Sequence, residues 1–422
     1  MKRLILALGI LLAVMTVAYG YTVTRRERQY RQLVAEGDIA LVRGDLGNAV
    51  TIFGEAITLK PESMVGYLKR GDAHRRRRDP EAAATDLEKA QTLNPTEPRV
   101  LELLGDVATS RHLHDRAAEY YGAYIGLDDR PRVLYKLGLA RHLAGQQKEA
   151  VDALRQAVRL DSRLAEAHYL LGICLRDLKA LQGAQAAFDR AVAVSPTLLA
   201  AREQLAEVHG LLGRRPERIK QLEALLLAAP SPGRLVVLAV AYADAGQVTR
   251  AIRALGGVAD LYPSYPGTYL ALGRLWLDIA ESGDDHVALG KALDALQQAV
   301  SMEASSASLS LLGQARLIAG DPSAAERTLR QATETIPAEP SSFLHLASAA
   351  DRTGHLEIAR RALLDYQALT GASDANFLVR VAQAQWRSGD AAGARATLTR
   401  ALDRDPDNEQ GRELARRLGL PR

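Results

Sequence analysis

The sequence predicts an all-α protein, a superhelical solenoid of about eleven helical hairpins that follows one N-terminal transmembrane helix. Two observations predict this fold class. An uncharged apolar segment lies close to the N-terminus, and a repeat of about 34 residues, with two apolar patterns of helical period in each copy, fills nearly all of the rest. Although 422 residues would usually suggest two or three globular domains, such repeats form one elongated body without strands.

The N-terminal segment, residues 1–24, is expected to be a membrane anchor or a signal segment. Its uncharged run begins at Leu4 and ends at Val23, which as a helix is long enough to cross a bilayer once. This length favours a retained anchor. A cleaved signal peptide is the alternative, because Ala18 and Gly20 are small residues at the spacing that cleavage requires.

The charges beside this segment set its expected orientation. Arg25 and Arg26 follow the segment directly, and by the positive-inside rule this flank places the repeats in the cytoplasm. We therefore expect a single-pass protein of the bacterial inner membrane with cytoplasmic repeats. A long domain can be translocated despite its flanks, so periplasmic repeats are the alternative.

Each repeat carries small residues at fixed positions and large residues between them. A glycine or alanine at the eighth position and an alanine at the twentieth are expected where two helices cross closely, so that a methyl group is the most that fits. A large apolar residue four positions later fills the space between hairpins, and a proline ends most units. The units begin near Tyr30, Met64, Pro98, Pro131, Ala165, Leu199, Pro232, Pro266, Ser306, Pro340 and Ala375.

The sixth unit departs from this pattern. Arg218 and Leu225 stand where the two alanines are expected, and an arginine does not fit a close helix crossing. This departure predicts loose packing and a hinge there. The hinge divides residues 25–230, which hold units one to six, from residues 231–407, which hold units seven to eleven.

The eighth unit and the end of the array differ from the pattern as well. Seven extra residues in the eighth unit predict an extended turn over residues 282–290. Residues 408–422 are expected to contain a capping helix with a charged outer side, because the last apolar face of a repeat array needs a polar cover.

This layout resembles the tetratricopeptide repeat family over roughly residues 30–407. The resemblance implies that other proteins or extended peptide segments bind along the first helix of each hairpin, at repeat positions two, five, nine, twelve and thirteen. The run Ala18-Tyr19-Gly20-Tyr21, followed by Arg25 and Arg26, resembles the anchor of the bacterial lipopolysaccharide assembly protein B family. That family ends in a metal domain with paired cysteines, whereas this chain has the single cysteine Cys174.

These repeat positions hold two sets of candidate partner-binding residues. The first set is expected to form an acidic ladder that favours a basic or amide-rich segment, and it comprises Asp38, Asp72, Glu102 and Asp106. The second set offers aromatic and cationic contacts, and it comprises Tyr135, His142, Tyr169 and Arg176. The alternatives are neutralisation of the aspartates by Lys69, Arg75 and Arg76 and buried packing of the two tyrosines.

A third set of residues is expected at the membrane surface. Its members are basic and are therefore attracted to anionic lipid headgroups, and they comprise Arg25, Arg26, Arg75, Arg76, Arg77 and Arg78. For the four consecutive arginines the alternative is a solvated helix end.

No enzyme signature is present, and we expect no catalytic, cofactor or metal site and no small-molecule substrate. His112, His114 and Asp115 form a compact trio without a further ligand at metal-binding spacing, and Cys174 lies on an apolar stretch typical of a buried thiol. The net charge of +4 is small and its arginines are dispersed, so nucleic acid is not expected as a partner.

The expected function is that of a membrane-anchored scaffold, which binds other proteins during assembly or regulation of a bacterial envelope complex. One alternative is an exported periplasmic protein that supports polysaccharide secretion or cell-wall assembly. The other is a regulatory subunit of a membrane enzyme or protease.

Overall fold

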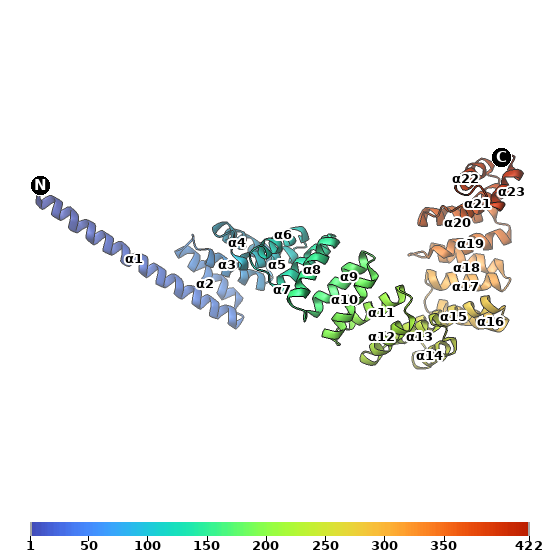
Figure 1. Ribbon diagram of the computed structural model, residues 1–422, viewed down its shortest axis with the longest axis horizontal. Coiled ribbons are helices and arrows are strands. Elements are labelled where there is room, and N and C mark those ends of the chain that lie inside the picture. The colour runs from blue at the N-terminus through green and yellow to red at the C-terminus, as the bar shows by residue number, and fades with distance from the viewer. Residues whose placement is uncertain (1, 421–422) are drawn as a thin grey trace. The chain divides into compact units, whose positions relative to one another are not determined.

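The computed structural model describes residues 2–420, which form 23 helices and no strand. In the first helix, the side chains of residues 2–10 and 13 lie outside the described part. The helices follow one another as hairpins (Figure 1), and each hairpin is one repeat. The predicted all-α array of helical hairpins is therefore confirmed.

The first helix, α1, spans Lys2–Arg43 without a break. The segment boundary expected at residue 24 and the unit start expected near Tyr30 both lie inside it. The Tyr30 side chain is 6% exposed, and its hydroxyl lies 2.7 Å from the Ser63 hydroxyl. The N-terminal half of α1 projects beyond α2 (Leu46–Leu59; Figure 1), and its exposed large apolar side chains run from Leu11 to Val23.

None of the described helices is long and apolar enough to cross a membrane. The predicted transmembrane segment covers residues 4–23, and the side chains of residues 4–10 and 13 lie outside the described part of the chain.

The chain divides into two compact units, Met1–Arg214 and Arg215–Arg422, whereas the sequence predicts a division after residue 230. The first unit continues after α2 with α3 (Met64–Arg76), α4 (Pro80–Leu93), α5 (Pro98–Ser110), α6 (His114–Ile125), α7 (Pro131–Leu143), α8 (Gln147–Leu160), α9 (Ala165–Asp177), α10 (Leu181–Val194) and α11 (Leu199–Leu211). The second unit contains α12 (Arg215–Ala228), α13 (Pro232–Asp244), α14 (Val248–Leu261), α15 (Pro266–Gly283), α16 (His286–Met302), α17 (Ser306–Ile318), α18 (Pro322–Glu334), α19 (Pro340–Thr353), α20 (Leu356–Thr370), α21 (Ala375–Arg387), α22 (Ala391–Arg404) and α23 (Glu409–Leu418).

Local signals in the sequence fix where these helices begin and end. Each predicted unit start after Tyr30 is the first residue of a helix. Several of these starts are prolines, whose missing N–H costs nothing in the first helical turn. The turn inside a hairpin often needs a positive φ, which glycine adopts readily, as at Gly145 with a φ of 78°. Arg78 takes the same conformation after α3, with a φ of 63°.

The small residue at the eighth position lets the two helices of a hairpin touch. At Gly172 an added Cβ would lie 2.5 Å from a ring carbon of Phe188, which is completely buried. The same conflict arises at Gly105 with the Tyr121 ring. At these glycines not even the methyl group that the sequence sets as the upper limit would fit, because the large partner already fills that space.

Arg218 does not occupy a close helix crossing in α12. Its guanidinium lies 2.7 Å from the Asp244 carboxylate of α13, and the buried face of α12 consists of Ile219, Leu222 and Leu225. The arginine is 25% exposed and lies beside α13, on a helix that buries leucine and isoleucine instead of alanine. The predicted hinge stays a prediction.

The extended turn predicted over residues 282–290 is wrong. Helix α15 has 18 residues and α16 has 17, so the extra residues add about one turn of 3.6 residues to each helix. Asp284 ends α15 in the left-handed conformation, and the Asp285 carboxylate accepts the Val287 and Ala288 N–H groups at the start of α16. Two consecutive aspartates therefore suffice for the connection.

The capping helix is confirmed as α23. It buries Leu414, Ala415 and Leu418, and the Asn408 side chain accepts the Gly411 N–H at its N-terminus. Its arginines and its first glutamate are exposed, which gives the last repeat a polar outer side.

Candidate functional site

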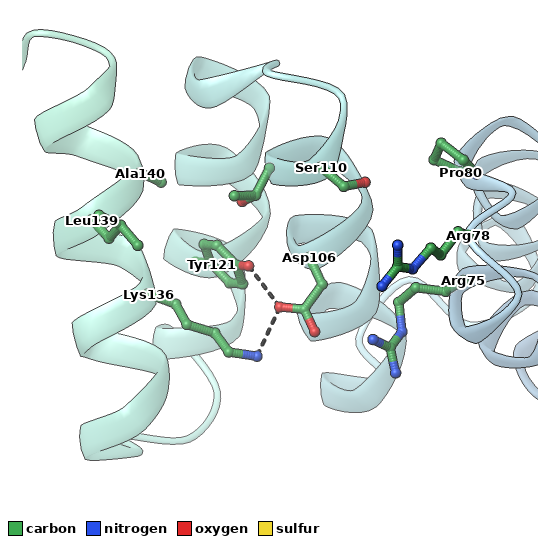
Figure 2. Close-up of a pocket in the computed structure, with 10 residues that line it drawn as sticks. Arg75, Arg78, Pro80, Asp106, Ser110, Tyr121, Lys136, Leu139 and Ala140 are labelled. Atoms are coloured by element: carbon green, nitrogen blue, oxygen red, sulfur yellow. Dashed lines mark hydrogen bonds and ion pairs between the residues drawn. The ribbon is translucent and has the colours of Figure 1, made fainter.

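A groove crosses the first helices of the second, third and fourth repeats, inside the first compact unit. We call it the inner groove; its volume is about 620 Å³, and α3, α5 and α7 supply most of its lining. Its charged groups are Arg75, Arg78, Asp106 and Lys136. Figure 2 shows Lys136 and Tyr121 on one side of Asp106 and the two arginines on the other.

Asp106 lies at the centre of a hydrogen-bonded cluster in this groove. The Tyr121 hydroxyl donates to its carboxylate at 2.7 Å, and the Lys136 Nζ lies 2.7 Å from the same oxygen (Figure 2). Burial and the Asp106 charge raise the pKa of Tyr121 far above its ordinary value, so its hydroxyl remains a donor.

Glu102 belongs to the same cluster. It binds Lys136 at 2.8 Å and Arg99 at 2.8 Å. Burial alone would raise the pKa of Glu102, but the hydrogen bonds and charges of Lys136 and Arg99 bring it below its ordinary value. Glu102 is therefore ionised near neutral pH, and its charge is balanced inside the chain.

The opposite wall of the inner groove carries two arginines with different surroundings. Arg75 binds Asp72 at 2.6 Å, and Arg76 binds the other oxygen of Asp72 at 3.1 Å. The Arg78 side chain is exposed and makes no hydrogen bond or ion pair with any described residue. Arg78 is thus the cation in this groove that is not already neutralised.

The acidic ladder is not a free negative surface. Asp38 lies 2.8 Å from Lys69 of the next repeat, and Asp72, Glu102 and Asp106 have the basic partners described above. The alternative reading, neutralisation by neighbouring cations, accounts for all four carboxylates. A cation at position six of one repeat reaches the carboxylate at position nine of the repeat before it, as Lys69 and Lys136 do.

The aromatic and cationic set lies on α7 and α9 and outside the lining of the inner groove. Tyr135 and Tyr169 are half-buried and pack against the apolar core, and the Tyr169 ring lies 6.0 Å from the Phe188 ring. His142 is bonded to Gln147 at 3.0 Å, and Arg176 is paired with Asp177 at 3.1 Å. Packing explains the tyrosines, and a binding role of this set stays a prediction.

The predicted membrane-surface arginines do not form one uniform group. Arg25 and Arg26 are exposed on α1. In the run of four, Arg75 and Arg76 share Asp72, and Arg77 lies 3.0 Å from Asp79. The run therefore presents only part of its charge to solvent, with Arg78 turned into the inner groove.

No group of three metal-ligating side chains occurs in the described residues. The rings of His112 and His114 lie 5.9 Å apart, edge to face. Cys174 is completely buried, and burial raises the pKa of its thiol to about 11, so it is not a reactive thiolate at neutral pH.

A comparable groove lies on the first helices of the tenth and eleventh repeats in the second unit, and sequence reasoning missed it. We call it the C-terminal groove; its volume is about 280 Å³. Arg380 donates to the Ser348 hydroxyl at 2.7 Å, Arg352 donates to the Leu317 carbonyl at 3.1 Å, and Arg387 is paired with Asp351. In the sequence, Ser348 at position nine of the tenth repeat and Arg380 at position six of the eleventh occupy the same repeat positions as Asp106 and Lys136, and this correspondence could have revealed the groove.

Sequence models of the tetratricopeptide repeat (TPR) match residues 34–98, 68–132, 138–175 and 344–409. The chain contains TPR repeats. A curated relative, small glutamine-rich tetratricopeptide repeat-containing protein 2 of Mycosarcoma maydis, is 32% identical over 109 residues, which are 26% of this chain and 31% of the relative. The chain thus spans less than a third of the length of that relative. The resemblance to lipopolysaccharide assembly protein B finds no counterpart among these matches.

One solved TPR structure agrees with the fold, and two further structures show weaker similarity. The C-terminal part of a TPR protein from Cytophaga hutchinsonii is 16% identical, matches 57% of this chain and 99% of its own, and has a TM-score of 0.50. PilF of Pseudomonas aeruginosa is 16% identical, matches 49% of this chain and 94% of its own, and has a TM-score of 0.42. YrrB, described as a TPR protein with an unusual peptide-binding site, is 20% identical over 42% of this chain and 93% of its own, with a TM-score of 0.40.

Proposed function

We propose that this chain is a TPR scaffold without catalytic activity, and that it binds extended segments of other proteins in the inner groove. One observation carries the proposal: the inner groove is about 620 Å³ in volume and presents the unpaired guanidinium of Arg78 beside Asp106 and Tyr121. Extended segments bind such surfaces through side chains that fit local pockets and charges.

The charges of the groove favour an acidic side chain opposite Arg78. All four carboxylates of the ladder already have basic partners, so a basic segment would gain only by displacing them. A carboxylate beside Arg78 would form a new charge-assisted bond without breaking an existing one. This replaces the basic or amide-rich segment that the sequence favours.

The proposal includes anchoring by α1 in the bacterial inner membrane. Supporting it are the exposed apolar side chains between Leu11 and Val23 and the basic pair Arg25 and Arg26 that follows them. In water this helix would expose a large apolar surface with no protein cover in its own unit. Cytoplasmic repeats, bound to proteins of an envelope complex, follow from the positive flank.

The first experiment selects peptides from a random display library on the full chain. We expect the selected peptides to be rich in aspartate and glutamate. Arg78→Glu is expected to abolish binding of those selected peptides that occupy the inner groove, whereas Arg77→Glu, at the neighbouring arginine that is paired with Asp79, is the matched control and should leave it unchanged. Selection of lysine-rich peptides would instead restore the acidic-ladder interpretation.

A second experiment locates the repeats. Alkaline phosphatase and a cytoplasm-active fluorescent protein are fused separately after Arg422 in a Gram-negative host. Fluorescence without phosphatase activity is expected, and the reverse would place the repeats in the periplasm. Extraction of the full chain from membranes by salt or alkali, without detergent, would contradict the anchor itself.

A further inference from the structure

A second groove lies in the first unit between α6, α7 and α8. We call it the outer groove; its volume is about 500 Å³. Gly122 and Ile125 of α6 line one side, Arg141 of α7 lies in the middle, and Arg155 and Arg159 of α8 line the other side. The proposed function and the sequence interpretation use none of these residues.

The outer groove lies on a different face of the repeat from the inner groove. Helix α7 takes part in both, with Lys136 in the inner groove and Arg141 in the outer one. A helix turns by about 100° per residue, so these two side chains leave α7 roughly 140° apart. A ligand in one groove therefore does not occupy the other.

Among the described residues, the arginines of the outer groove have no acidic partners. Arg155 and Arg159 stand one helical turn apart, are exposed, and make no hydrogen bond or ion pair with the described residues. Arg141 donates only to the Glu149 carbonyl, at 3.2 Å. Asp152 is the single carboxylate in the lining, so three cations face one anion and the groove carries two excess positive charges.

Gly122 contributes no side chain to this groove. It lies inside α6, where glycine destabilises a helix relative to alanine. Nothing lies within 4 Å of the position that a Cβ would take there, so packing inside the chain does not require glycine. The half-buried Ile125 lines the groove on the same helix and provides an apolar floor.

We propose that the outer groove is a second docking site, which binds an acidic segment of a partner protein with an apolar side chain against Ile125 and Gly122. The excess positive charge selects acidic residues. The apolar floor favours a peptide over a nucleic acid, and Asp152 can accept an N–H group of a peptide backbone. This site is independent of the inner groove and goes beyond the proposed function.

The test measures fluorescence anisotropy of a short synthetic peptide, in which glutamates flank a pair of leucines, on the full chain. We expect Arg155→Glu with Arg159→Glu to weaken binding at least about tenfold, since like charges would then face each other. Gly122→Trp should fill the groove and cause a similar loss. Gly122→Ala, the matched control, and Arg78→Glu, in the inner groove, should each change the affinity less than about twofold.

Three results would overturn the proposal. Equal affinity of the charge-reversed and native chains would show that the arginines do not bind the peptide. Loss on charge reversal without loss in Gly122→Trp would show attraction to a charged surface but no docking in the groove. Tighter binding of a single-stranded oligothymidylate, sensitive to the same variants, would assign the site to nucleic acid.

Discussion

The inner groove of the first unit and the C-terminal groove of the second are built on the same link between neighbouring repeats. In both, a cation at position six of one repeat reaches the side chain at position nine of the repeat before it. In the first unit Lys136 meets Asp106 at 2.7 Å, whereas in the second Arg380 meets Ser348 at 2.7 Å. Asp106, together with Glu102, neutralises Lys136, whereas the Ser348 hydroxyl leaves the charge of Arg380 in place. The residue at position nine therefore helps to decide whether this link leaves a free charge.

The inner groove and the second unit place carboxylates in different surroundings. In the inner groove the Asp106 side chain is 23% exposed. In the second unit Glu326 is 4% exposed, and it is bound by Arg330 of the same helix, by Thr353 at the end of α19 and by His355 in the turn before α20, at 2.5, 2.5 and 2.7 Å. Asp86 of the first unit, outside the groove, is equally buried and is paired with Arg70. The carboxylates of the inner groove thus shape a surface, whereas Glu326 joins α18 to the end of α19.

The largest expected effect tests the tight contacts that glycine permits in the first unit. Gly172→Leu should lower the free energy of unfolding by about 1–3 kcal/mol, because the Phe188 ring already fills the space. Urea denaturation followed by circular dichroism measures it. Gly122→Ala, at a position with open space, is the control and should raise stability. A neutral Gly172→Leu would show that the repeat register is misplaced.

Removal of the buried carboxylate is expected to have the next largest effect. Glu326→Ala should cost about 1–3 kcal/mol, since it removes a buried carboxylate that accepts charge-assisted hydrogen bonds. Asp106→Ala should cost about 0–1 kcal/mol, because the ion pair of Asp106 with Lys136 is partly exposed. Equal losses in thermal unfolding would remove the distinction between the groove carboxylate and the buried one.

Exchange of the position-nine residues tests the shared link directly. Asp106→Ser should leave Lys136 with Glu102 as its remaining acidic partner among the described residues and tighten binding of acidic peptides in the inner groove by about two- to fivefold, corresponding to less than about 1 kcal/mol. The affinity of a peptide selected on the native chain provides the measurement. Asp38→Ser frees Lys69 outside this groove and is the matched control. Unchanged affinity after Asp106→Ser would mean that Lys136 does not reach the ligand.

The smallest expected effect concerns pH. Burial lowers the pKa of His345, whose Nδ1 is buried without a hydrogen-bond partner, so the folded chain holds this ring neutral. Below about pH 6.5 the unfolded chain binds the proton first, and the free energy of unfolding falls as pH decreases. His345→Leu should flatten the thermal stability between pH 7 and 5. If the thermal stability of His345→Leu falls with pH as steeply as that of the native chain, other groups cause the loss of stability.

The Glu326 carboxyl group adds a second pH-dependent contribution to the free energy of unfolding, at lower pH than His345. Burial alone would raise the pKa of Glu326, but hydrogen bonds from Thr353, His355 and Arg330 lower it below its ordinary value. Its stabilisation is complete above the pKa of the unfolded chain, about 4.3, and disappears as pH falls through the lower folded value.

The helices were predictable because their signals are local. Small residues at the eighth position, prolines in first turns and glycines in hairpin turns lie within a few residues of the feature that they determine. The lengths of α15 and α16 were not predictable. A helix continues until a residue ends it, and in this hairpin the first helix ends only at Asp284 and the second begins after Asp285. The uninterrupted α1 was missed for the same reason.

The candidate site was predictable in position but not in charge. The repeat pattern placed Asp106 on the first helix of a hairpin. Its partner Lys136 belongs to the next repeat, so the pair can be found only by comparing equivalent positions of neighbouring repeats. Arg78 was assigned to a membrane surface because four consecutive arginines look alike in sequence. The turn after α3 separates them, since its positive φ sends Arg78 into the inner groove.

The uninterrupted course of α1 has a mechanical consequence. No joint separates its projecting N-terminal half from Tyr30, which is locked into the first hairpin beside Ser63. A force or rotation applied to the exposed half is therefore transmitted through one continuous helix to the first hairpin. Insertion of a single residue between the two halves would turn all the repeats of the first unit by about 100° around this axis and shift them by about 1.5 Å.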